Sequence, residues 1–216
     1  DERDNNLPIT LVSGAAPTPA AQANITDEQA NDFIKTMPKN IQEKTVNAIG
    51  KNPAVLGYTK SVVKYAKKFD VDPAYIMAKM FVESSFDKKS NNKEKDARGL
   101  LQLLQGTAEL VAKDLGLDPK TIEPYNPDTN IKLGIKYYKD QLDTFGKADE
   151  NGKKINPGDL PWIASAAYHW GPDRDTLKNI VAKMRREGVR LYDPTAKNVL
   201  FHQIPNESEG KTQRYI

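Results

Sequence analysis

The sequence predicts an all-α protein. Apolar residues recur at the 3.6-residue spacing of helices along most of the chain, clusters of Gly, Pro and Asn separate these stretches, and no neighbouring pair alternates like two strands. With 216 residues, the chain can form one substantial hydrophobic core. We therefore expect one helical domain with an N-terminal helical extension rather than two large domains.

Composition narrows the classes of function. Hydrophobic residues make up 38% and charged residues 28%, and no apolar run approaches the roughly 20 residues that span a bilayer, so we expect no membrane span. The net charge is +3 with lysines and acids interspersed, which argues against a nucleic-acid partner. The lack of cysteine excludes disulfides and thiolate chemistry, and two histidines are too few to favour a metal centre.

The two ends of the chain differ from its middle. The chain starts at Asp1 without a Met or a basic-then-apolar leader, which predicts a processed product or an excised fragment. Residues 1–23 are polar and then rich in Ala and Pro, which predicts a flexible linker or tail. Residues 189–216 lack periodicity, and we expect them to wrap over the helical body.

The first helices form the extension, residues 24–54. Thr26 or Asp27 caps a helix that runs to Met37, and residues 39–49 form a second amphipathic helix. Residues 55–216 are predicted to form the main domain. Its expected helices cover residues 54–69, the segment after Asp72, and residues 107–115, 128–145, 161–170 and 173–187. Residues 87–96 are too polar and charged to bury, so we expect an exposed, mobile loop there.

One helix carries a carboxylate where its apolar face should continue. If Asp72 is the N-cap and Pro73 the first helical residue, the helical period places Ile76, Met80 and Glu83 on one side. Partial burial would favour the protonated form of Glu83 near neutral pH, which is what a general acid needs. The competing interpretation is a helix-end carboxylate that points into water or pairs with a nearby lysine.

Five sequence blocks follow one another in the order found in one enzyme family. They are Glu83-Ser84-Ser85-Phe86, Gly99-Leu100-Leu101-Gln102 with Gly106-Thr107-Ala108, residues 124–138, residues 166–172 and residues 204–216. Together they resemble the soluble, SLT-type lytic transglycosylases, goose-lysozyme-like enzymes that cleave bacterial peptidoglycan. The family patterns are E-S-S-F, G-L-M-Q, N-I-x-x-G-x-x-Y, A-Y-N-x-G-P and P-x-E-T-x-x-Y-V. The resemblance implies a lysozyme-like helical fold.

The resemblance also implies a reaction that uses one carboxylate and neither a metal nor an organic cofactor. Most glycosidases use two carboxyl groups, and substrate-assisted enzymes are an exception. Glu83 would protonate the oxygen that links N-acetylmuramic acid to N-acetylglucosamine, while the substrate's acetamido carbonyl stabilises the charge at C1. Glu83 would then take the proton of the muramic acid C6 hydroxyl, which closes a 1,6-anhydro ring without consuming water.

The family assigns supporting roles around Glu83. Tyr168 would hydrogen-bond Glu83, and Ala167 would offer its backbone carbonyl to an acetamido group of the substrate. Ser84 belongs to the same signature as Glu83, and Tyr215 would close the glycan groove from the C-terminal side.

Other positions would line the groove or build its walls. Gln102 and the backbone around Gly99 and Leu100 would face the substrate, because glycine permits close approach. Leu104 stands where the family often has a methionine against the sugar, although the leucines of this stretch also suit a core. Further along, Gly134 would permit close packing and Asn130 would satisfy buried backbone groups.

The sequence departs from the family pattern in several places. His169 replaces an Asn, Leu101 a Met and Gln105 a Pro, and Ser90 is displaced from the position of the family's loop serine. His169 would either bring a titratable group to the site or pack beside Trp170.

Two alternatives stay open. A goose-type hydrolase would use aspartates to position water, and Asp96 lies in the loop where one could sit, although a solvated charge balanced by Lys95 or Arg98 is the simpler explanation. The second alternative is a noncatalytic wall-binding module of a larger phage or secretion assembly. In each case, peptidoglycan glycan strands are the expected partner. The cell-wall compartment (periplasm) is the expected location, reached as a virion component or as an exported bacterial protein.

Overall fold

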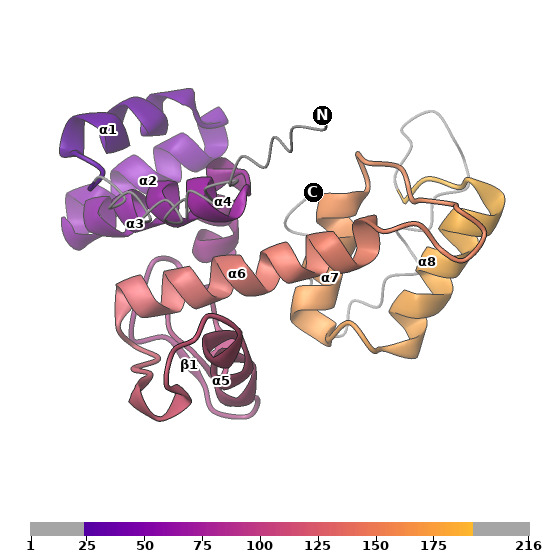
Figure 1. Cartoon of the computed structure of the whole chain (residues 1–216). Coiled ribbons are helices and arrows are strands. Elements are labelled where there is room, and N and C mark those ends of the chain that lie inside the picture. The colour runs from indigo at the N-terminus through magenta and orange to yellow at the C-terminus, as the bar shows by residue number, and fades with distance from the viewer. Residues whose placement is uncertain (1–23, 192–216) are drawn as a thin grey trace, which may run out of the picture.

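The structure is a computed structural model, and it describes residues 24–191 (Figure 1). This part of the chain is mainly helical, as predicted. Its helices are α1 (Asp27–Thr36), α2 (Lys39–Lys51), α3 (Ala54–Phe69), α4 (Pro73–Ser84), α5 (Gln105–Asp114), α6 (Pro127–Gly146), α7 (Leu160–Trp170) and α8 (Asp175–Glu187), with a 3-10 turn η1 (Pro119–Thr121). None of the described helices is long and apolar enough to cross a membrane. The predicted linker, residues 1–23, and Tyr215 lie outside the described residues.

Helices α1 and α2 share the core of the helices that follow them. Thr26 caps α1 through a capping box with Gln29, which confirms the predicted start of this helix. Ile34, Met37 and Ile41 are buried in the same hydrophobic cluster as α3 and α4. Whether residues 24–54 form a separate extension stays a prediction.

Helix α7 lies between two hydrophobic clusters. One of its sides, with Ala164 and Tyr168, belongs to the main cluster built by α3, α4 and α6. Its other side, with Ile163, Ala166 and Ala167, packs into a second cluster around α8. Figure 1 shows α6 running through the middle of the molecule toward α7 and α8. Because both sides of α7 are buried, its sequence is apolar almost all round.

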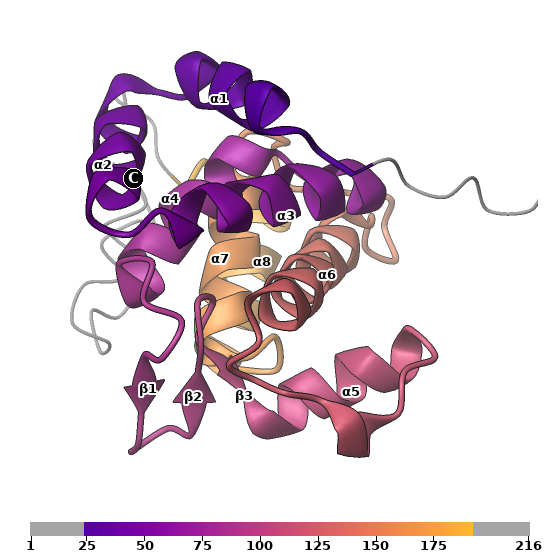
Figure 2. The same cartoon turned by 90° about the vertical axis from the view of Figure 1, so that its left-hand side faces the viewer.

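A small antiparallel sheet joins α4 to α5 (Figure 2). Its strands are β1 (Asn91–Asn92), β2 (Ala97–Arg98) and β3 (Leu103–Leu104), in the order β1-β2-β3. The sequence analysis predicted no strand pair, and the structure differs from that prediction by this sheet. Each strand has only two residues, which is too short for an alternating pattern to be visible. The polar segment 87–96, expected to be a loop, therefore contains β1.

Candidate active site

Helix α4 carries Glu83 in its last turn. The Asp72 side chain accepts a hydrogen bond from the N–H of Ala74 at 2.8 Å and Pro73 is the first helical residue, so the predicted start is confirmed. The helix ends immediately after the carboxylate, because Ser85 and Phe86 both adopt left-handed backbone conformations with φ of 53° and 65°. Only 2% of the Glu83 side chain is exposed. The interpretation in which Glu83 points into water is therefore wrong, whereas its alternative, a pairing with a nearby lysine, is present as the contact with Lys79.

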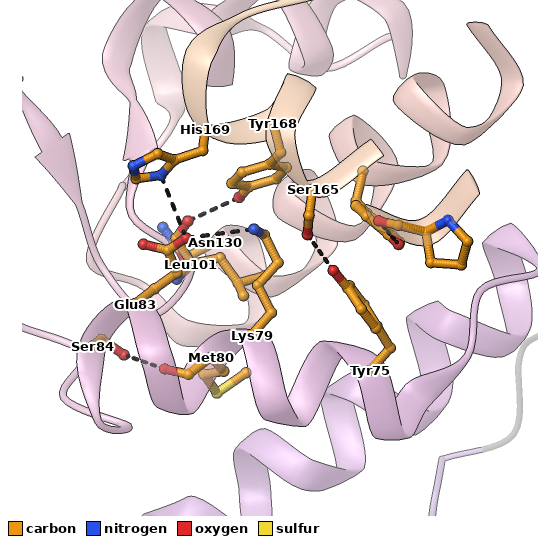
Figure 3. Close-up of polar contacts among 12 residues, drawn as sticks. Tyr75, Lys79, Met80, Glu83, Ser84, Leu101, Asn130, Ser165, Tyr168 and His169 are labelled. Atoms are coloured by element: carbon orange, nitrogen blue, oxygen red, sulfur yellow. Dashed lines mark hydrogen bonds and ion pairs between the residues drawn. The ribbon is translucent and has the colours of Figure 1, made fainter. Parts of the chain in front are cut away.

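Two basic side chains approach the Glu83 carboxylate (Figure 3). Lys79 lies one turn earlier on α4, and its Nζ is 3.4 Å from Glu83 Oε1. His169, at the end of α7, places Nδ1 4.0 Å from the same oxygen. Of the two outcomes expected for His169, the structure shows the one that brings a titratable group to the carboxylate.

The Tyr168 hydroxyl binds the backbone beside Glu83. It donates to the carbonyl oxygen of Leu101 at 2.8 Å, and the ring lies under Lys79 Nζ at 3.8 Å from the ring centroid. Burial, followed by the negative charge of Glu83, raises the pKa of Tyr168 well above its usual value. The sequence analysis expected Tyr168 to hydrogen-bond Glu83. In the structure the single hydroxyl proton goes to Leu101, so Tyr168 meets the carboxylate only as a near neighbour.

The segment of residues 98–104, in which Leu101 lies beside Glu83 (Figure 3), is held by Asn130 of α6. The Asn130 side chain is 2% exposed, accepts the N–H of Leu101 at 2.8 Å, and donates to the carbonyls of Arg98 and Pro124, each at 3.0 Å. Gly99 has φ of +77°, and a Cβ there would lie 2.5 Å from Asn130 Nδ2. The expectation that Asn130 satisfies buried backbone groups is confirmed.

Gly134 makes the close approach expected of it. A Cβ at this position would lie 2.5 Å from Cδ1 and 2.9 Å from Cβ of Leu101. Because Gly134 has no side chain, the Leu101 segment can pack directly against α6.

The remaining residues of the segment divide into buried and exposed. Leu100, Leu101 and Leu103 are buried in the main core, whereas Leu104 is 46% exposed. Gln102 adopts φ of 46°, and its amide donates to the carbonyls of Gly99 at 2.9 Å and Ser90 at 3.0 Å. Gln102 therefore ties the segment to the start of the sheet, and its contact with substrate stays a prediction.

Ser84 and Ala167 use their polar groups within their own helices. The Ser84 hydroxyl donates to the Met80 carbonyl at 3.1 Å, and the Ala167 carbonyl accepts the N–H of Gly171 at 2.9 Å. Their predicted substrate contacts are not tested by these bonds, because a carbonyl has a second lone pair for a ligand.

Asp96 is balanced by Arg98, as the simpler of the two interpretations proposed. Arg98 donates to Asp96 Oδ1 through Nε at 2.9 Å and Nη2 at 2.5 Å, and the Asp96 side chain is 58% exposed. Ser90 contributes its carbonyl, which accepts the N–H of Gly99 at 2.9 Å. Across residues 24–191, no group of three His, Asp or Glu side chains is placed to hold a metal ion.

The fold is mainly helical, and it buries the Glu83 carboxylate beside Lys79 and His169. Comparison with known families gives the class of protein. The Transglycosylase SLT domain matches residues 60–189, more than half of the chain, and the chain belongs to this family. The membrane-bound lytic murein transglycosylase F of Pseudomonas fluorescens is 32% identical over 130 residues. That match covers 58% of this chain but only 23% of the relative.

Two solved structures share the fold. The lytic transglycosylase Slt of Pseudomonas aeruginosa, solved as an inactive mutant, matches 87% of this chain with a TM-score of 0.52 and 20% identity. The 70 kDa soluble lytic transglycosylase of Escherichia coli matches 88% with a TM-score of 0.54 and 19% identity. The chain covers 30% and 31% of these proteins, respectively. The predicted lysozyme-like helical fold is confirmed.

The sequence analysis missed Lys79 as part of the site. A lysine in an amphipathic helix is usually assigned to the solvent face, yet Lys79 is fully buried. The available signal was its spacing, because residues four apart on a helix lie on the same face. Once Glu83 is placed inside, Lys79 must lie beside it.

Proposed function

We propose that this domain is a peptidoglycan lytic transglycosylase in which Glu83 acts first as general acid and then as general base. Membership in the SLT family supports the reaction class. The burial of Glu83, whose side chain is 2% exposed, is the observation that carries the assignment of the catalytic role. A carboxyl group with so little access to water is held in one orientation and exchanges protons with a bound partner rather than with bulk solvent.

In the first step, protonated Glu83 donates its proton to the oxygen between N-acetylmuramic acid and N-acetylglucosamine. The bond from C1 to that oxygen breaks, and N-acetylglucosamine leaves with the proton. The acetamido carbonyl of the muramic acid residue stabilises the positive charge at C1. Substrate assistance of this kind removes the need for a second enzymatic carboxylate.

In the second step, ionised Glu83 takes the proton of the C6 hydroxyl of the muramic acid residue. The C6 oxygen forms a bond to C1, and the product is a 1,6-anhydro sugar. Glu83 is again protonated, and no water has been added. Lys79 Nζ and His169 Nδ1 stand 3.4 and 4.0 Å from the carboxylate, so the ionised form has a lysine and a histidine beside it between the two steps.

The structure favours this reaction over hydrolysis. A hydrolase of the goose lysozyme type would need an aspartate to hold the attacking water, and the candidate Asp96 is engaged by Arg98. The burial of Glu83 beside Lys79 and His169 carries a desolvation cost, which a catalytic role would account for.

We further propose that the glycan strand contacts exposed Leu104 and the neighbouring Gln102, beside the buried Gly99, Leu100 and Ala167, with Tyr215 completing the site. The exposure of Leu104 supports an apolar contact with a sugar ring. The cell-wall compartment is the place of action that a peptidoglycan substrate requires, whether the protein arrives with a phage particle or by export. Residues 24–54 would serve as a helical extension of the catalytic domain.

The test is digestion of purified sacculi by the wild type and by Glu83→Gln, with mass spectrometry of the released muropeptides. We expect anhydromuropeptides from the wild type and a loss of at least about 100-fold in the variant. Glu43→Gln, which changes an exposed glutamate on α2, serves as the matched control. Reducing ends in place of anhydro ends would indicate the hydrolase. Binding of sacculi without turnover, unaffected by Glu83→Gln, would indicate the noncatalytic module.

A further inference from the structure

Lys79 is the second buried charge of the site. The residue is 0% exposed, and its side chain is as shielded as that of Glu83, at 1% against 2%. Its Nζ lies 3.4 Å from Glu83 Oε1 and 3.8 Å from the centroid of the Tyr168 ring. The ammonium group therefore has a carboxylate on one side and the face of an aromatic ring on another. Both favour its charged form and oppose the effect of burial, which disfavours it.

Stability alone does not explain a lysine at this position. Burying an ammonium and a carboxylate costs several kcal/mol per ion, and apolar residues of similar volume are often neutral or stabilising replacements. A methionine would fill a similar space beside the Tyr168 ring without that cost. The charge of Lys79 therefore has a clear use beside the Glu83 carboxylate, 3.4 Å from its Nζ.

We propose that Lys79 is a positioning residue that holds the Glu83 carboxylate and sets the pH range over which Glu83 can donate a proton. The proposal rests on the proposed acid and base roles of Glu83. Burial favours protonated Glu83, and the neighbouring ammonium favours the ionised form. Lys79 thus limits the rise in the pKa of Glu83 that burial alone would cause. Without that limit Glu83 would stay protonated and could not act as the base.

The proposed steps transfer no proton to or from Lys79, so its charge is the same throughout the reaction. In the first step the proton leaves Glu83 for the glycosidic oxygen, and Lys79 stabilises the carboxylate that remains. In the second step that carboxylate takes the proton of the C6 hydroxyl, and the starting arrangement returns. Lys79 neither gives nor receives a proton, so it acts through Glu83 rather than on the substrate.

The other titratable groups around the pair come from three helices. Helix α7 presents His169 and Tyr168, α4 presents Tyr75, and α6 presents Tyr137 against the Tyr168 ring. Burial raises the pKa of each of these tyrosines, to about 12 for Tyr75, so they stay neutral in the range where a carboxyl group works. Among the groups named here, His169 is the other residue type whose charge can change there.

The first test is the pH dependence of anhydromuropeptide release by Lys79→Met. Removing the cation lets Glu83 keep its proton to higher pH, so the alkaline limb of the rate profile should move up by about 1–2 pH units. Lys79→Gln, which is polar but neutral, should move the limb in the same direction. His169→Asn separates the contribution of the histidine, and Lys113→Met, at an exposed position on α5, is the control for loss of a positive charge. A profile for Lys79→Met that superimposes on the wild type would overturn the inference.

The second test does not depend on activity. Thermal unfolding of Lys79→Met, Glu83→Gln and the double variant forms a cycle around the pair. Glu83→Gln alone leaves a buried ammonium without its carboxylate, so its Tm should fall by on the order of 5–10 °C. The double variant should recover most of that loss. Additive changes in Tm would contradict the pairing, whereas an inactive wild type with a strongly coupled cycle would refute the proposed function and leave the pairing intact.

Discussion

Asn130 and Tyr168 come from two different helices and bind opposite polar groups of the same residue. The Asn130 side chain accepts the N–H of Leu101, and the Tyr168 hydroxyl donates to the carbonyl of Leu101, each at 2.8 Å. The Leu101 side chain meanwhile rests against Gly134. The segment opposite Glu83 is thus fixed to α6 and α7 at both ends of one residue, which supplies a rigid surface beside the proposed catalytic carboxylate.

Asn130→Ala should destabilise the protein strongly. The substitution leaves the Leu101 N–H and the carbonyls of Arg98 and Pro124 without their partner, and each unsatisfied buried group costs roughly 1–3 kcal/mol. We expect the free energy of unfolding to fall by about 3 kcal/mol or more in urea titrations. Asn179→Ala, at an exposed position on α8, should change it by less than about 0.5 kcal/mol. Equal effects of the two variants would refute the role of Asn130.

Tyr168→Phe should keep the ring and lose the anchor to Leu101. The Lys79 contact with the ring remains, but the Leu101 carbonyl loses its donor, at a cost of roughly 1–2 kcal/mol. If that anchor positions the segment beside Glu83, the rate of anhydromuropeptide release should fall about tenfold, which corresponds to about 1.4 kcal/mol. Tyr125→Phe, at a 38% exposed tyrosine, should alter neither stability nor rate. An unchanged rate in Tyr168→Phe would limit Tyr168 to a structural role.

Gly134→Ala tests the close packing of Leu101 on α6. Alanine favours a helix over glycine by about 1 kcal/mol, yet its Cβ would lie within 3 Å of two Leu101 atoms. Overpacking of this kind typically costs about 1–3 kcal/mol, so we expect a lower Tm. Gly57→Ala in α3 meets nothing within 4 Å and should raise the Tm. Leu101→Ala should remove the 2.5 Å contact with Cδ1 but keep the 2.9 Å contact with Cβ, so its combination with Gly134→Ala should be somewhat less damaging than the sum of the two.

Asp96→Asn separates the lyase from the hydrolase at the level of a single side chain. The ion pair with Arg98 is largely exposed, so its loss should cost at most about 1 kcal/mol. For a lytic transglycosylase, the variant should release anhydromuropeptides at the wild-type rate. A large loss of activity would give Asp96 the water-positioning role of a hydrolase, and the muropeptide ends identify which reaction was lost.

Alkaline pH should destabilise the layer between α4 and α7. Burial raises the pKa of Tyr75 from 10.0 to about 12, and its hydroxyl shares a short hydrogen bond with Ser165. Because the folded state holds this proton more tightly than the unfolded state, the contribution is complete below pH 10 and is lost progressively between pH 10 and 12, amounting to about 2–3 kcal/mol. Denaturant titrations across this range should show a shallower decline for Tyr75→Phe. Identical slopes would contradict the raised pKa.

The helices were predictable because their signals are local. The capping box at Thr26, the Asp72 cap before Pro73 and the apolar period of α3 each lie within a few residues, and the structure confirms them. Asn130 and Gly134 were assigned correctly because they belong to a contiguous block whose resemblance to a family carried their roles.

The unpredicted features depend on contacts between distant segments. The sheet consists of two-residue strands. The turn at residues 93–96 joins β1 to β2 and the turn with Gly99 and Gln102 joins β2 to β3, and a pattern of period two cannot appear in two residues. The Tyr168 hydroxyl donates to Leu101 rather than to Glu83, and this depends on how two segments 67 residues apart in the sequence pack together. Lys79 has a lysine's ordinary preference for solvent, which only the packing of α7 over α4 overrides.

The reversal of the chain at Ser85 and Phe86 separates helix α4, which carries Glu83, from the hairpin that follows it. Phe86 is buried in the main core, and the N–H of Gly99 donates to the carbonyl of Ser90. The base of the hairpin is therefore fixed by contacts that do not involve its tip. The tip, residues 93–96, is a fully exposed turn. This tip is therefore a suitable insertion site. An affinity tag, a fluorophore or a wall-targeting peptide inserted there would extend into solvent without moving the Glu83 carboxylate.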